Sequence, residues 1–200
     1  KLSDEEEAEI EKLLESSEDP LPRPTGENLG RIYKEEDAAE AYLNYLQSTI
    51  NTDLKGLKIV IDGANGAAYS LAPRLFTQLG ADVTTIFTEP DGTNINEGCG
   101  STQPEQLQKH VKAAKADIGL AFDGDADRLI AVDEQGEIID GDQIMCICGA
   151  FLKENGALKN NTIVVTVLSN LGFFKAMEEL NIDTITTKVG DRYVVEQIRE

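Results

Sequence analysis

The fold class of this chain is indicated most clearly by Lys58-Ile-Val-Ile-Asp-Gly-Ala-Asn-Gly-Ala67. Its apolar start, residues 58–62, predicts a short buried strand that ends in an acidic residue. The two glycines that follow predict a tight turn into a helix over 67–79, which Gly80 ends. A strand that leads through a tight turn into a helix is the first half of a parallel α/β unit.

The same alternation continues toward the C-terminus. Further strands are expected over 82–88 and 118–122, with a helix over 102–115 between them. Thr102 followed by Glu105 is the predicted start of that helix. The order strand, helix, strand, helix, strand is typical of a right-handed parallel unit, so the expected class is α/β.

After residue 122 the pattern changes and then resumes. Two short apolar runs flank Glu134-Gln-Gly136, which predicts a β-hairpin. A second α/β series is then expected, with a helix over 142–153, a strand over 162–168, a helix over 172–180, a strand over 183–189 and a helix after Gly190. The two series are expected to be similar α/β units.

The first 40 residues differ in composition from the rest, with 14 acidic and 5 basic residues. Ser3 and Glu6 match the capping-box pattern of a helix start. We interpret the acidic run as a solvated helix face. Pro20–Pro24 predicts a linker, and a second helix is expected over 35–50.

Charge and cysteine content exclude several classes of protein. The net charge of −19 and a pI near 4.3 disfavour nucleic-acid binding. No apolar run approaches the about 20 residues of a membrane span, and the residues after Lys1 do not resemble a secretory signal. Cys99, Cys146 and Cys148 are too few for a disulfide framework, so we expect reduced thiols in a cytoplasmic protein. One histidine and no Cys-x-x-Cys pair argue against a zinc site.

The segment most informative about chemistry is Phe122-Asp-Gly-Asp-Ala-Asp-Arg128. It places Asp123, Asp125 and Asp127 directly after a predicted buried strand. Carboxylates two residues apart in a looped backbone can converge on one hard cation, and Mg²⁺ prefers oxygen ligands of this kind. The carboxyl ends of parallel strands are also where α/β sheets bind ligands. Arg128, beside the acids, can donate two hydrogen bonds to a phosphate or sugar oxygen.

Two other interpretations of this segment stay open. The acids partly fit a calcium-binding EF-hand loop, but Arg128 stands where that loop needs glycine, and the flanks predict strands. The acids could also form a plain solvated turn, although carboxylates so close together repel one another unless something neutralises them.

Three further features carry weaker signals. Gly63–Gly66 lacks the G-x-G-x-x-G spacing of a dinucleotide loop, which favours a plain strand-to-helix turn. His110 is expected on the surface, with no adjacent acid or nucleophile for a catalytic triad. The turn at Lys188–Val194 either binds an anionic or polyol ligand or is a plain helix start, with Asp191 stabilising the helix dipole.

Several of these stretches together resemble one enzyme family. Asp123–Arg128 is similar to the metal-binding loop of the α-D-phosphohexomutases. The supporting stretches are Lys58–Ala67, Gly92–Thr102, Val167–Asn170 and Thr187–Val194. The resemblance covers nearly the whole chain, and the second and fourth of these stretches favour the branch that acts on glucosamine phosphates.

The resemblance implies a four-domain enzyme. Residues 1–36 would be the end of domain one plus a linker, and residues 37–140 a complete three-layer α/β sandwich domain with the metal loop. Residues 141–200 would be part of a second, similar domain. The chain starts at Lys1 and stops inside a helical pattern, so we expect a piece of a longer polypeptide.

The resemblance also implies site residues. Mg²⁺ would be held by Asp123, Asp125 and Asp127 together with a phosphoserine. Arg128 would contact the substrate or the phosphoserine. The turn formed by Gly190, Asp191 and Arg192 would bind the sugar.

The implied reaction converts glucosamine 6-phosphate into glucosamine 1-phosphate. A phosphoserine donates its phosphoryl group, a bound bisphosphate turns over, and the product leaves. The family's serine loop, of the form Thr-Ala-Ser-His-Asn-Pro, is absent from this sequence. The chain therefore has no catalytic nucleophile of its own and is expected to be inactive alone.

The implied protein is a cytoplasmic isomerase of cell-wall precursor synthesis that takes a phosphorylated amino sugar. It would bind neither nucleic acid nor membrane, and the full-length enzyme would be a homodimer. The alternatives are a phosphomannomutase or phosphoglucomutase, a non-catalytic divalent-metal-binding module, and a nucleotide-binding α/β domain that uses Gly63–Gly66.

Overall fold

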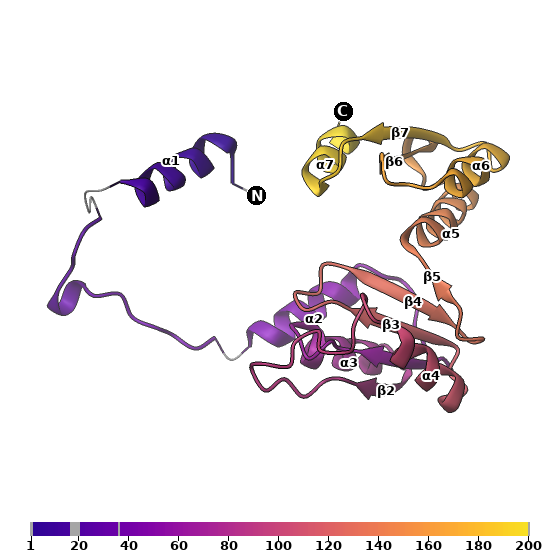
Figure 1. The fold of residues 1–200 in the computed structure, drawn as a ribbon, viewed down its shortest axis with the longest axis horizontal. Helices are drawn as coiled ribbons and strands as arrows, with labels where there is room; N and C mark the ends of the chain where they lie inside the picture. The colour runs from indigo at the N-terminus through magenta and orange to yellow at the C-terminus, as the bar shows by residue number, and fades with distance from the viewer. Residues whose placement is uncertain (1, 17–20, 36, 200) are drawn as a thin grey trace. The chain divides into compact units, whose positions relative to one another are not determined.

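A computed structural model describes residues 2–16, 21–35 and 37–199, which form two compact units, residues 1–38 and 39–200 (Figure 1). The first unit contains helix α1 (Asp4–Glu15) and the short 3₁₀ helix η1 (Gly26–Asn28). The predicted capping box is confirmed, since Ser3 Oγ accepts from the Glu6 N–H and the Glu6 carboxylate accepts from the Ser3 N–H. The predicted linker lies partly outside the described residues, because Pro20 is not among them.

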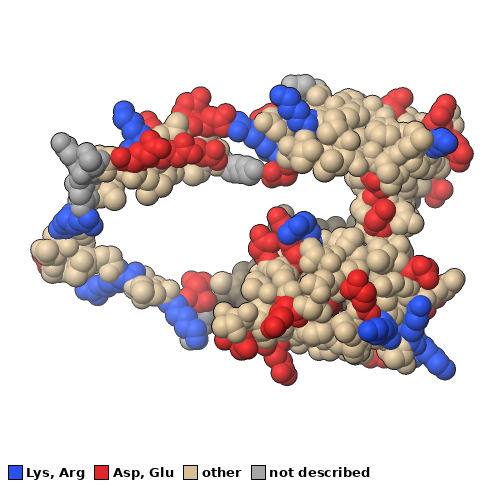
Figure 2. Space-filling view, viewed as in Figure 1, with Lys and Arg blue, Asp and Glu red and all other residues tan. Residues whose placement is uncertain are grey.

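The acidic face of α1 is solvated, as the composition predicted. No residue of α1 is buried, and its first turn holds four acids. Figure 2 shows acidic side chains in red along the helix. Water and salt screen the repulsion between exposed charges, so this helix tolerates its acidic composition.

The second unit contains a five-stranded sheet with the strand order β2-β1-β3-β4-β5 (Figure 1). Its strands are β1 (Lys58–Asp62), β2 (Asp82–Ile86), β3 (Ile118–Phe122), β4 (Leu129–Asp133) and β5 (Ile138–Ile139). β1 pairs in parallel with β2 and β3, whereas β3, β4 and β5 pair antiparallel. The predicted parallel unit and the predicted hairpin are therefore both confirmed.

Alternate residues of the strands face two separate layers of helix. Ile59 and Ile61 of β1 pack in one cluster with helix α3 (Ala68–Gln78). Val60 packs on the opposite face with helix α4 (Glu105–Ala114). This alternation is what a two-residue strand period requires when both faces are covered. The expected three-layer α/β sandwich is confirmed.

Helix α2 (Ala38–Ser48) lies beside α3, where the Glu40 carboxylate pairs with Arg74. Leu43 is its fully buried residue. The helix predicted over 35–50 is therefore confirmed, although it begins three residues later and ends two residues earlier than expected.

Two further predicted boundaries in this part of the chain need correction. Thr102 does not cap α4, because Pro104 directly precedes the helix and no side chain caps it. Proline suits this position since the first helical N–H groups have no partner within the helix. Strand β2 ends at Ile86 rather than at 88, because Phe87 adopts a left-handed φ of 52° that leaves the strand conformation.

The second α/β series forms a two-stranded parallel sheet. Its elements are α5 (Gly141–Glu154), η2 (Lys159–Asn161), β6 (Thr162–Thr166), α6 (Leu171–Glu179), β7 (Asp183–Thr187) and α7 (Asp191–Arg199). β6 pairs with β7 from Thr162–Asp183 to Thr166–Thr187, so both strands end two residues earlier than predicted. Val165, Phe173, Met177 and Ile182 form the core of this part.

Two expectations about exclusions can be compared with the structure. Among the described residues, none of the helices has the length and apolar character that crossing a membrane requires. Cys99, Cys146 and Cys148 are all free, and Cys99 is fully buried.

Candidate metal centre

The three predicted aspartates lie in the loop that joins β3 to β4. Asp123 follows β3 directly and is 1% exposed, whereas Asp125 and Asp127 are exposed. Each residue offers a carboxylate oxygen, and these oxygens lie within 4.8 Å of one another. The structure therefore brings Asp123, Asp125 and Asp127 together at the carboxyl end of a parallel strand.

The backbone of the loop explains why the acids converge. The Ala126 N–H donates to the Asp123 carbonyl oxygen at 3.1 Å, and Ala126 adopts a left-handed φ of 62°. The Asp123 N–H then donates to the Arg128 carbonyl oxygen at 3.3 Å and closes the loop. A left-handed alanine is strained, and such strain is concentrated at functional loops. The tight turn places alternate side chains on one side.

Arg128 binds the buried aspartate of the group. Its backbone N–H donates to Asp123 Oδ1 at 3.0 Å, and its Nε donates to Asp123 Oδ2 at 2.8 Å. Its Nε also lies 3.6 Å from Asp127 Oδ1. The side chain remains 69% exposed, so part of the guanidinium still faces solvent. Arg128 thus orients the Asp123 carboxylate, a role that the sequence did not predict.

The electrostatics of the group favour a bound cation. Burial opposes the ionisation of Asp123, but the hydrogen bonds and positive charge of Arg128 outweigh it and lower the pKa of Asp123. The negative charge of Asp125 raises the pKa of Asp127. One arginine therefore does not balance three carboxylates, and a hard divalent cation would relieve their repulsion. The donor set is all carboxylate oxygen, which fits Mg²⁺ or Ca²⁺ rather than a soft metal.

The EF-hand alternative is wrong for this segment. The loop is flanked by the antiparallel strands β3 and β4 and not by two helices. The plain solvated turn is wrong for Asp123, because that side chain is buried and ion-paired.

Two neighbouring loops donate backbone hydrogen bonds to residues 122–128, which we call the aspartate loop. In the turn after β1, the Ala67 N–H donates to the Gly124 carbonyl oxygen at 2.8 Å. In the loop before α4, the Ser101 N–H donates to the Phe122 carbonyl oxygen at 2.9 Å. The sequence did not predict either contact, because hydrogen bonds between backbone groups do not depend on the type of the residue.

The Gly63–Gly66 segment is a tight strand-to-helix turn, as the sequence favoured. The Gly66 N–H donates to the Gly63 carbonyl oxygen at 2.9 Å, and both Ala64 and Asn65 adopt left-handed φ values. Asn65 stabilises this conformation, since its Oδ1 accepts from the Glu89 N–H at 3.0 Å.

The predicted sugar-binding turn lies on the other sheet, after β7. Gly190 has a φ of 134°, and the Tyr193 N–H donates to its carbonyl oxygen at 3.1 Å. Asp191 is in the first turn of α7, and Arg192 Nε donates to the Glu196 carboxylate at 3.2 Å. This geometry fits both a helix start and a ligand-binding turn, so the role of Gly190, Asp191 and Arg192 stays a prediction.

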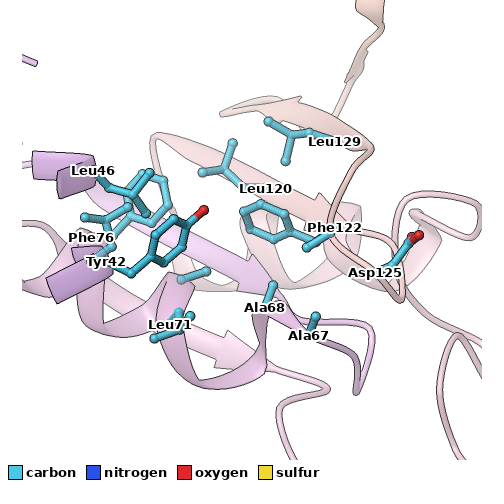
Figure 3. Close-up of a pocket in the computed structure, with 13 residues that line it drawn as sticks. Tyr42, Leu46, Ala67, Ala68, Leu71, Phe76, Leu120, Phe122, Asp125 and Leu129 are labelled. Atoms are coloured by element: carbon cyan, nitrogen blue, oxygen red, sulfur yellow. The ribbon is translucent and has the colours of Figure 1, made fainter. Parts of the chain in front are cut away.

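An apolar hollow of about 460 Å³ reaches the aspartate loop from the α2 and α3 side of the sheet (Figure 3). Tyr42 and Leu46 of α2 line one end and Asp125 lies at the other. His110, in contrast, is exposed on α4, with its Nδ1 2.8 Å from the Gln106 carbonyl oxygen, as expected for a surface histidine.

Two protein-family models match the chain. Residues 40–136 match the phosphoglucomutase/phosphomannomutase alpha/beta/alpha domain II, and residues 140–200 match domain III of the same family. The chain belongs to the phosphoglucomutase/phosphomannomutase family. The predicted resemblance is confirmed, while the exact boundaries at residues 36 and 140 remain a prediction.

Relatives within this family are similar over the whole chain. A phosphoglucosamine mutase from Desulforamulus reducens is 57% identical over 200 residues, and one from Bacillus cereus is 58% identical over 199. These alignments cover all of this chain but only 45% and 44% of the two relatives. The chain thus spans less than half the length of the curated relatives it matches.

Solved structures of the family share the fold. A phosphoglucomutase/phosphomannomutase family protein from Burkholderia thailandensis superposes with a TM-score of 0.71 at 32% identity, covering 84% of this chain and 36% of that one. An N-acetylglucosamine-phosphate mutase superposes with a TM-score of 0.58 at 23% identity, covering 80% of this chain and 38% of that one, which is a likeness of fold alone.

Proposed function

We propose that this chain is a segment of a Mg²⁺-dependent phosphoglucosamine mutase. The protein that contains it would interconvert glucosamine 6-phosphate and glucosamine 1-phosphate through a phosphoserine and a bisphosphate intermediate. The observation that carries this proposal is the convergence of three aspartate carboxylates in a segment matched to domain II of the family. Relatives named phosphoglucosamine mutase, 57–58% identical over the whole chain, support the amino-sugar substrate.

In this proposal Asp123, Asp125 and Asp127 hold Mg²⁺. When bound, the ion supplies positive charge that stabilises the negative charge spread over the phosphoryl oxygens. Asp123 is held ready by Arg128 and keeps its negative charge because its pKa is lowered. Asp125 and Asp127 are exposed and so remain accessible to the ion.

Arg128 is proposed to have two functions. Its Nε orients Asp123, and the exposed part of its guanidinium faces the phosphoryl group or the substrate. A planar guanidinium can bind a carboxylate and a phosphate oxygen at once, which a lysine cannot do with fixed geometry. Gly190, Asp191 and Arg192 are proposed to bind the sugar.

The nucleophile is proposed to come from outside this chain, since the sequence contains no Ser-His-Asn-Pro loop. We also propose a cytoplasmic location and a homodimer for the full-length enzyme, as expected from the sequence. The second candidate function is that of a phosphomannomutase or phosphoglucomutase. The match to the two family models supports it as well as it supports the first candidate, because the models are named for these two activities.

The test is the Asp125→Ala substitution in the full-length protein, with turnover measured at saturating Mg²⁺. The expected result is a loss of about 10²–10³-fold in kcat, the usual cost of removing one electrostatic contributor to the transition state. Asp82→Ala is the matched control, because Asp82 is an exposed aspartate at the opposite end of the sheet. Turnover within twofold of the unmodified enzyme would overturn the metal assignment.

The substrate is tested by comparing glucosamine 6-phosphate with glucose 6-phosphate and mannose 6-phosphate. The proposal expects the highest kcat/KM for the amino sugar. A higher kcat/KM for either hydroxy sugar would favour the second candidate function.

A further inference from the structure

Asp62 is a buried carboxylate outside the aspartate group, and the proposed reaction does not use it. It ends β1 and is 0% exposed. Its Oδ1 accepts from the Ala64 N–H at 2.8 Å, and its Oδ2 accepts from the Gly100 N–H at 2.9 Å. Both partners are backbone groups in loops, so Asp62 fixes two loops at once.

These are the two loops that contact the aspartate loop. The turn 63–67 supports Gly124 through the Ala67 N–H, and the loop 94–101 supports Phe122 through the Ser101 N–H. The two loops are also joined to each other, since the Asn96 N–H donates to the Ala64 carbonyl oxygen at 2.9 Å.

The packing holds the start of the aspartate loop, at Phe122 and Gly124, closely against both supporting loops. A methyl group on Gly66 would lie 2.7 Å from Gly124 Cα, and one on Gly100 would lie 2.7 Å from the Phe122 carbonyl oxygen. A methyl group on Gly124 would lie 2.7 Å from Asn96 Nδ2. Each distance is shorter than ordinary contact, so a shift of either supporting loop displaces the aspartate loop.

The chemistry of Asp62 suits this position. Two N–H groups approach it, and a carboxylate offers an acceptor to each. Asparagine has the same shape but presents an NH₂ group to one of the two N–H donors, which leaves that donor unpaired in a buried site.

We propose that Asp62 is a positioning residue for the metal centre. It holds the turn 63–67 and the loop 94–101 under the aspartate loop and so sets the spacing of Asp123, Asp125 and Asp127. The inference rests on the proposed function only in requiring that these aspartates bind a divalent cation.

The test measures the affinity for Mn²⁺ in the full-length protein and in its Asp62→Asn variant. The concentration of free Mn²⁺ is monitored by its EPR signal. The expected result is an affinity at least about 10-fold weaker, the lower end of the range for residues that support metal ligands. Asp117→Asn is the matched control. Asp117 accepts from the Lys58 N–H at 2.8 Å at the opposite end of β1, and its substitution should leave Mn²⁺ affinity unchanged.

A purely structural role predicts a different outcome. The variant would then melt at a lower temperature, but its folded molecules would bind Mn²⁺ as the unmodified protein does, and this result overturns the proposal. If Asp62→Asn does not fold, Asp62→Ser offers one acceptor oxygen in place of two and so loses a hydrogen bond to the Ala64 or the Gly100 N–H group. It should weaken Mn²⁺ binding to a similar extent, and unchanged affinity would again overturn the proposal.

The unmodified protein separates this inference from the proposed function. If it binds Mn²⁺ and Asp62→Asn binds equally well, the role of Asp62 alone is overturned. If the unmodified protein and the Asp117→Asn control both fail to bind Mn²⁺, the metal centre itself is overturned, and the role of Asp62 with it.

Discussion

Gly66→Ala should displace the aspartate loop although it changes no charged residue. A methyl group at residue 66 would lie 2.7 Å from Gly124 Cα and 2.8 Å from its carbonyl carbon, and closer still to its carbonyl oxygen. Ordinary contact begins at 3.4 Å, so the two backbones must separate by at least about 0.7 Å. The neighbouring atoms belong to backbone and cannot rotate away, which makes this clash costly.

The structure sets the expected magnitude. Gly66 does not have a positive φ, so alanine suits its backbone and the cost comes from overpacking alone. Overpacking a close-packed site costs roughly 1–3 kcal/mol. For a cooperative unit of about 150–250 residues, each kcal/mol lowers Tm by about 2–4 °C. The Ala67 to Gly124 hydrogen bond of 2.8 Å should also lengthen, and Mn²⁺ affinity should fall with it.

The assay is thermal unfolding by circular dichroism together with Mn²⁺ titration. Gly141→Ala is the matched control, because a methyl group there meets nothing within 4 Å and the residue is the first of α5. The control should unfold at the same temperature as the unmodified protein or slightly above it. Equal Tm and equal Mn²⁺ affinity for Gly66→Ala and Gly141→Ala would refute the argument that this glycine pair positions the loop.

Three further predictions concern the Cys99 thiol and the helix cap Asp140. Burial raises the pKa of the Cys99 thiol to about 11. At pH 8, iodoacetamide should therefore modify the exposed Cys148 and spare Cys99. Mass spectrometry of the protein modified in its native state measures this, and rapid modification of Cys99 would contradict the prediction. Because the folded state disfavours the Cys99 thiolate, the contribution of this thiol to stability should be lost as the pH rises toward about 11. Asp140 caps α5 by accepting from the Gln143 N–H at 2.9 Å, so Asp140→Ala should cost about 1 kcal/mol in chemical denaturation, whereas Asp140→Asn should retain most of that stability.

The candidate metal centre combines one buried aspartate with two exposed ones. Asp123 is ion-paired and fixed by Arg128, so its carboxylate is already oriented before any cation arrives. Asp125 and Asp127 are exposed and repel each other, which raises the pKa of Asp127. A site of this kind is partly preorganised and gains stability when a cation neutralises it.

Local sequence determined the elements of the sheet with good accuracy. The apolar runs at 58–62 and 118–122 became β1 and β3 at the predicted residues, because each run is bounded by residues that end a strand. The capping box at Ser3 and the helix end at Gly80 were also correct, since both depend on bonds within a few residues. The start of α4 was predicted wrongly, because Pro104 competes with Thr102 for the same local role.

The sequence also indicated which residues form the candidate metal centre, since three aspartates on alternate positions after a buried strand match the oxygen ligands that Mg²⁺ prefers. It could not show that they converge. Convergence depends on the left-handed Ala126, on Arg128 turning back to Asp123, and on a Gly66–Gly124 contact between residues far apart in the chain. Nor did it indicate that Asp62, read only as the end of a strand, binds two loops. Residue types and short spacings indicate hydrogen bonds that form within one turn or one strand. Contacts between loops depend on which strands are neighbours in the sheet, because that arrangement brings the loops at the carboxyl ends of the strands together. The arrangement of the strands is a property of the tertiary structure.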